Sequence, residues 1–101
     1  MKQLAIFLNR MTGDIFKLLP MREDEIKGIE NHLNEYLDTL IVNAEGAVKT
    51  YPELMGSKEY LYVLNNLNYI STHDVEYTKW RKIILNSAKW LNNLERFYLG
   101  R

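Results

Sequence analysis

Apolar residues recur at intervals of three and four along most of this chain, the pattern of helices that bury one face. The first such segment covers residues 2–19, and Pro20 is expected to end it. Gly13 weakens its middle by about 1 kcal/mol relative to alanine, which allows a kink near residues 12–14. The apolar positions of this segment are Leu4, Phe7, Leu8, Met11, Ile15 and Leu18.

The second segment, residues 23–50, is the longest and has a sustained seven-residue spacing typical of helical bundles. Three acids in its first turn suit the positive end of the helix dipole, and Pro52 disfavours helical geometry at Tyr51. At 1.5 Å per residue, we expect a helix about 40 Å long. Its apolar positions are Ile26, Ile29, Leu33, Tyr36, Leu37, Leu40, Ala44, Ala47 and Tyr51.

A short connection follows at residues 52–56, where we expect Leu54 and Met55 to cover one end of the core. A third helix is predicted over residues 58–71, with Ser57 as its N-cap. Its apolar face comprises Tyr60, Val63, Leu67 and Ile70, with Leu61 and Leu64 beside them.

The fourth helix is predicted over residues 75–99, with Asp74 or Thr72 as N-cap and Gly100 as C-cap. Its predicted inner face comprises Trp80, Ile84, Ser87, Leu91, Leu94 and Tyr98, flanked by Ile83, Trp90 and Phe97. The opposite face is polar and comprises Lys82, Asn86, Lys89, Asn93 and Arg96.

These segments predict an all-α fold, an antiparallel four-helix bundle in a single domain spanning residues 1–101. No strand-like alternation interrupts them, and the short connections favour antiparallel neighbours. The alternative is a pair of long helices that completes its core by dimerising.

Composition favours a soluble cytoplasmic protein without a disulfide framework. The chain has 101 residues, no cysteine, 47% hydrophobic and 26% charged residues. The apolar run at residues 4–8 is too short for a signal peptide or a membrane span.

Charge is unevenly distributed although the net charge is zero. Residues 22–59 have a net charge of −5, and residues 75–101 have a net charge of +4. We favour the interpretation that the acidic second helix and the basic fourth helix pack as neighbours. The alternative is that the basic helix faces an acidic partner.

No catalytic, cofactor-binding or metal-binding motif is present, so a non-enzymatic protein is expected. His32 and Glu35 provide two of the three or four ligands that a metal site needs, and a surface histidine is the favoured interpretation. Ser57 and Ser71 are interpreted as capping residues, and Ser87 as a small residue that lets a neighbouring helix approach. No phosphate-binding loop or serine nucleophile motif occurs.

Two surfaces are candidates for binding. Val42 lies on the outer face of the second helix, and Asn43 lies at the edge of its inner face. Together with three aromatic residues they suggest more exposed apolar surface than a solitary bundle needs, which is typical of a protein interface. The candidate partner-binding residues are Val42, Tyr62, Tyr69 and Trp90. The basic fourth helix suggests nucleic-acid binding instead, although a recognition helix is normally shorter. Its candidate contacts are Lys79, Arg81, Lys82, Lys89 and Arg96.

The stretch from Ala44 to Tyr77, which includes Pro52, a Tyr-Leu-Tyr-Val-Leu run and then Trp80–Arg81, resembles small uncharacterised helical proteins of Gram-positive phages and prophages. The resemblance rests on helix ends and core positions. It implies a phage origin and carries over no functional residue. The missing site chemistry and the surplus of aromatic residues on the third and fourth helices predict a small accessory protein that acts by binding another protein, with a homodimer as one arrangement. Bacteriocin immunity proteins are similar in architecture alone, as four-helix bundles with a basic C-terminal part, and an immunity-type protein is the third function that we consider.

Overall fold

The computed structural model describes the backbone of residues 2–19 and 23–100 and the side chains of residues 3–19 and 33–100. Within these ranges the chain forms four α-helices and one 3₁₀-helix, with no β-strand. The helices are α1 (Lys2–Phe16), α2 (Glu23–Thr50), η1 (Pro52–Gly56), α3 (Lys58–Thr72) and α4 (Tyr77–Leu99). The prediction of an all-α fold is therefore confirmed.

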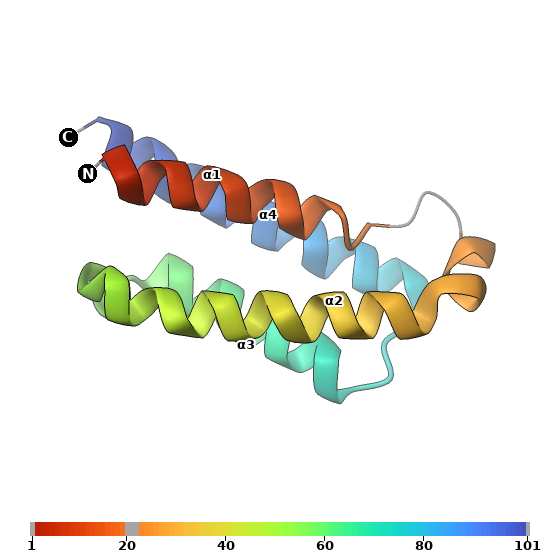
Figure 1. Cartoon of the computed structure of the whole chain (residues 1–101). Coiled ribbons are helices and arrows are strands. Elements are labelled where there is room, and N and C mark those ends of the chain that lie inside the picture. The colour runs from red at the N-terminus through yellow and green to blue at the C-terminus, as the bar shows by residue number, and fades with distance from the viewer. Residues whose placement is uncertain (1, 20–22, 101) are drawn as a thin grey trace.

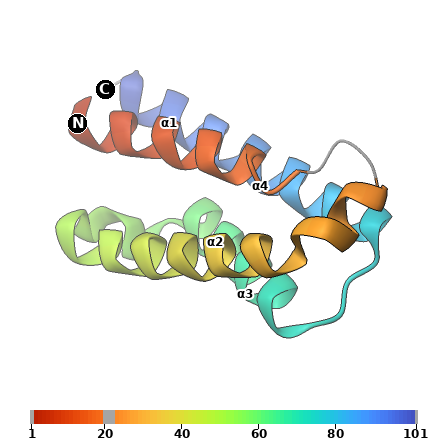
Figure 2. The same ribbon diagram turned by 45° about the vertical axis from the view of Figure 1, so that its right-hand side comes forward.

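The four helices form two layers, α1 beside α4 and α2 beside α3 (Figure 1; Figure 2). Both termini and η1 lie at one end of the molecule, and the connection between α3 and α4 lies at the other. The molecule measures 42 × 22 × 19 Å, so the 28 residues of α2 run along its whole length. The most extensive packing joins α1 to α4, and the next most extensive joins α3 to α4.

The core is made from the apolar faces that the periodicity predicts. On α1, Leu4, Leu8 and Ile15 are at most 1% exposed, and on α4 Ile84 and Leu91 are fully buried. The predicted positions of α2 from Leu37 onward are buried or partly buried, whereas the side chains of Ile26, Ile29 and His32 lie outside the described residues. Each helix thus contributes one apolar face to a shared interior.

The end of α1 differs from the sequence prediction. The α-helix ends at Phe16 and continues as a tight turn, in which Leu18 and Leu19 donate to the carbonyls three residues back. The indole of Trp80 donates to the carbonyl oxygen of Leu18 at 2.8 Å, so α4 holds this turn in place. The α-helix is continuous through Gly13.

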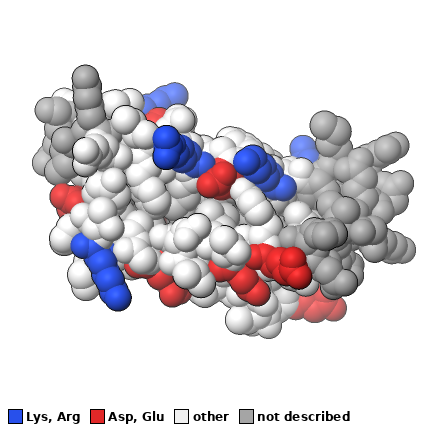
Figure 3. Space-filling view, in the orientation of Figure 1, with Lys and Arg blue, Asp and Glu red and all other residues white. Residues whose placement is uncertain are grey.

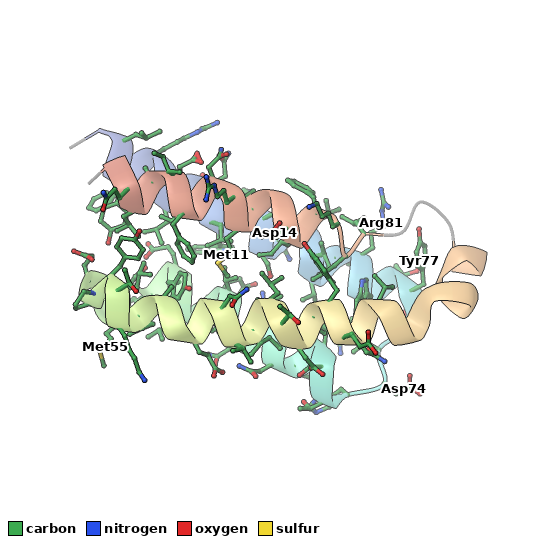
Figure 4. All side chains as sticks on the ribbon, viewed as in Figure 1. Met11, Asp14, Met55, Asp74, Tyr77 and Arg81 are labelled. Carbon is green, nitrogen blue, oxygen red and sulfur yellow. The ribbon has the colours of Figure 1, made fainter. Side chains whose placement is uncertain are left out.

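The connection between α2 and α3 is more ordered than a loop, because residues 52–56 form η1. Leu54 is fully buried as predicted, but Met55 is 67% exposed and projects from the end of the bundle (Figure 4). Ser57 is the N-cap of α3, and its hydroxyl accepts a hydrogen bond from the Tyr60 amide at 3.1 Å. The capping prediction is confirmed, whereas the prediction for Met55 is wrong.

The fourth helix begins two residues later than predicted, at Tyr77. Its N-cap is Glu76, whose side chain makes no capping hydrogen bond, so the assignment of this role to Asp74 or Thr72 is wrong. Residues 74–76 are extended and span the end of the bundle, which delays the start of the helix. Gly100 is the C-cap, as expected, and its amide donates to the Arg96 carbonyl.

Two tyrosines place hydroxyl groups inside the bundle, and the two hydroxyls differ in their hydrogen bonding. Tyr60 is fully buried, and its hydroxyl donates to the carbonyl oxygen of Ala44, which ties α3 to α2. The hydroxyl of Tyr36 is also buried, near the Asp14 carboxylate, and makes no hydrogen bond of standard geometry to a described residue. Burial raises the pKa of Tyr60, and burial together with the negative charge of Asp14 raises the pKa of Tyr36.

The substitution Tyr60→Phe is expected to lower the free energy of unfolding by about 1 kcal/mol, because it removes a buried hydrogen bond. Tyr36→Phe is the matched control, since it removes a buried hydroxyl that makes no hydrogen bond of standard geometry, and stability should fall less than in Tyr60→Phe. Urea unfolding at neutral pH measures both. Equal losses in the two variants would contradict this account.

Stability is also expected to fall in alkaline solution. An unfolded tyrosine ionises near pH 10, whereas these two tyrosines resist ionisation in the folded protein, because their pKa values are raised. Their contribution is therefore complete below about pH 10 and is lost as the pH rises further. Tyr60→Phe should lose less stability per pH unit than the native chain above pH 10, by up to about 1.4 kcal/mol. The same slope in both proteins would refute the prediction.

Candidate functional site

The structure brings two of the four predicted partner-binding residues together, Tyr62 on α3 and Trp90 on α4. Their ring centroids are 5.2 Å apart at an interplanar angle of 50°, and each side chain is 39% exposed. The two rings come from α3 and α4, which pack against each other. They form an exposed aromatic surface that bridges two helices, which we call the Tyr62–Trp90 pair.

Tyr69 lies two turns along α3 from Tyr62 and is already engaged by neighbouring residues. Its ring stacks on His73 with centroids 4.1 Å apart. The ammonium of Lys79 donates to the Tyr69 hydroxyl at 2.8 Å and lies 4.9 Å from the ring centroid. This cluster therefore holds Lys79 against α3, apart from the other basic residues of α4.

Val42 does not join the aromatic residues. It is 67% exposed on α2 and lies at a groove of about 650 Å³ between α1 and α2. Figure 4 shows Met11 and Asp14 on the side of α1 that faces this groove. Asn43 is exposed along the same groove and does not reach the core.

The basic residues of α4 divide into separate faces. Lys82, Lys89 and Arg96 are exposed and recur every seven residues, so they follow one outward line along the helix. Lys79 is held by Tyr69, and Arg81 projects from a different side of the helix. The five basic residues predicted to contact nucleic acid together therefore do not form one surface. Three of them follow one line along α4, and the other two lie apart from it.

The expectation that α2 and α4 neutralise each other as neighbours is wrong. In the described part of the chain α4 packs against α1 and α3, whereas α2 packs mainly against α3. Acidic side chains gather along the α2 edge of the molecule (Figure 3). Among residues 3–19 and 33–100, Lys17 and Asp14 form the one ion pair, at 3.6 Å, so the basic line on α4 is not paired with these acids.

The described side chains do not assemble a metal or nucleophile site. No group of three or more histidine, aspartate or glutamate residues lies close enough together there to hold a metal ion. Glu35 is exposed, and the side chain of His32 lies outside the described ranges. Ser87 is fully buried and accepts a hydrogen bond from Asn66 at 3.1 Å, so it lies between α3 and α4 as its small size predicted.

One polar residue of the interior was missed by sequence reasoning. Glu95 on α4 is 7% exposed and faces α1, where the amide of Asn9 donates to its carboxylate at 2.9 Å. Its position four residues after Leu91 and three before Tyr98, both on the predicted inner face, is a sequence signal of inward orientation. A charged residue at the edge of a polar face is ordinarily assigned to the surface.

No known protein family, curated protein or solved structure matches this chain. Over the residues that the structure describes, no helix combines the length and the apolar character needed to cross a lipid bilayer.

Proposed function

We propose that this chain is a small non-enzymatic accessory protein that acts by binding another protein through the α3–α4 face. The observation that supports this proposal is the exposed Tyr62–Trp90 pair, which two adjacent helices present together. Tyrosine and tryptophan supply much of the binding energy at protein interfaces, because each offers a large apolar area with few rotatable bonds.

The surroundings of the pair suit an interface. Leu61 and Phe97, on the same two helices, are also exposed apolar side chains, at 43% and 51%. The same two helices also present exposed, uncharged polar side chains, including Asn65 and Asn93. Exposed apolar surface with polar residues around it is typical of a binding site.

The proposal includes an antiparallel order of the helices, a phage or prophage origin and a homodimer as one arrangement. The shared end of the two termini and η1, with the α3–α4 connection opposite, supports an antiparallel order of the helices. The sequence resemblance supports the phage or prophage origin, and the composition supports a cytoplasmic location. A second copy of this chain is one partner that the proposal allows.

The proposal predicts that Tyr62→Ala and Trp90→Ala each weaken partner binding about 30-fold, which corresponds to the 2 kcal/mol of an interface hot spot. The measurement is affinity capture from host lysate after nuclease treatment, followed by titration of the purified partner. Leu85→Ala is the matched control, because Leu85 is 42% exposed on α4 but projects from another side of the helix.

Unchanged affinity in both aromatic variants, or an equal loss in the Leu85 variant, would exclude this face as the binding surface. Circular dichroism and urea unfolding of each variant establish whether a loss of binding reflects a loss of folding.

A second candidate function is nucleic-acid binding, which the exposed line of Lys82, Lys89 and Arg96 supports. Their spacing places three cations along one side of α4, without an ion pair to the described acids. Such a line suits contacts with phosphates, which provide affinity without sequence specificity.

If each of the three cations neutralises one phosphate, the logarithm of the affinity for duplex DNA should fall with the logarithm of salt concentration with a slope of about −3. The double substitution Lys82→Glu and Lys89→Glu should abolish binding. Lys17→Glu with Lys49→Glu makes the same change of charge in the turn after α1 and on α2, and should leave most of the binding. Filter binding across a salt series measures these effects, and salt-insensitive or absent binding rules the candidate out.

A further inference from the structure

The interface between α1 and α4 contains a buried carboxylate that forms no ion pair with a described side chain. Glu95 is 7% exposed, and one amide nitrogen of Asn9 lies 2.9 Å from Oε1 and 3.4 Å from Oε2. The ion pair between Lys17 and Asp14 is the one present among residues 3–19 and 33–100. Glu95 is therefore held by a neutral donor, with no described cation to balance its charge.

This arrangement leaves the carboxylate with unused capacity to accept hydrogen bonds. Two carboxylate oxygens offer about four lone-pair positions, and the single Asn9 amide occupies one side of the group. A buried carboxylate is costly unless opposite charge and further hydrogen bonds compensate the water it has lost. A cationic donor that reached Glu95 would supply both.

A pocket leads to this carboxylate from the surface. It has a volume of about 500 Å³, within the range of about 300–1,000 Å³ that is usual for ligand pockets. Two of its residues are strongly exposed apolar side chains, Ile6 at 53% and Leu99 at 61%. The lining comprises Ala5, Ile6, Asn9, Arg10, Glu95 and Leu99.

We propose that this pocket binds an arginine side chain of a partner protein. The guanidinium group pairs with the Glu95 carboxylate, and the aliphatic part of the side chain packs on Ile6 and Leu99. Arginine is favoured over lysine, because its planar group donates from several directions to a carboxylate that is already hydrogen bonded on one side. The site is separate from the Tyr62–Trp90 pair, which lies on the α3 side of α4.

Arg10 is the competing occupant within this chain. It lines the same pocket but is exposed and makes no ion pair with Glu95. A double-mutant cycle of Arg10→Gln and Glu95→Gln, measured by urea unfolding, determines whether the two side chains interact. We expect coupling of less than about threefold in the unfolding equilibrium constant, whereas coupling above tenfold would show that Arg10 fills the pocket and would overturn the proposal.

The direct test is a ¹H–¹⁵N NMR titration of the full chain with N-acetyl-argininamide. N-acetyl-citrullinamide is the matched control probe, because it has nearly the same shape without the charge. Glu95→Gln is the matched variant, because glutamine keeps an oxygen that accepts from Asn9. We expect saturable shifts around Asn9, Glu95 and Leu99 with the arginine probe. Binding should be at least about tenfold weaker for the citrulline probe and for the Glu95→Gln protein.

Equal binding of the two probes, retention of arginine binding by Glu95→Gln, or the absence of saturable shifts near the pocket would each overturn the proposal. Circular dichroism of the variant keeps the result interpretable, and Ile6→Ala provides a second variant on the exposed apolar edge. Its affinity for the arginine probe should fall about threefold while Glu95 is retained.

Discussion

The packing of α1 against α4 is the interaction on which the rest of the structure depends. It is the most extensive helix contact in the molecule, and it joins the two ends of the described chain. Leu4, Leu8 and Ile15 of α1 are almost completely buried. Without this contact α1 would expose its apolar face and lose the tertiary packing that stabilises it as a helix. The hydrogen bond from Trp80 to Leu18 extends the same contact to the turn after α1.

Periodicity was sufficient to predict the helices, because each one buries a single continuous face. The bounds of α2, the cap at Ser57 and most of the buried positions of α4 follow from the local sequence pattern. The failures share a different cause, since they concern which neighbour lies beside a given position. Leu61 and Leu64 flank the same predicted face, yet Leu64 is buried and Leu61 is 43% exposed. Only the placement of the adjacent helices separates them.

The candidate surfaces show the same limit. Spacing indicated that Tyr62 and Trp90 lie at the edges of their helices, but contact between them requires the relative position of α3 and α4. The expected pairing of acidic and basic helices conflicted with the predicted topology, because the second and fourth helices of a bundle with neighbouring consecutive helices lie across a diagonal. Glu95 was missed because a charged side chain is ordinarily assigned to the surface. Its place on the face of α4 that packs against α1 instead directs it toward Asn9.

The pairing of the first helix with the last also imposes a sequence of events on the nascent chain. About 60 residues separate the end of α1 from the start of α4. At translation rates of roughly 5–20 residues per second, α1 waits several seconds or longer for its main partner to leave the ribosome. During that interval Leu4, Leu8 and Ile15 have no partner on α4 to cover them. The newly synthesised chain is therefore most exposed to aggregation, and most open to chaperones, just before α4 emerges.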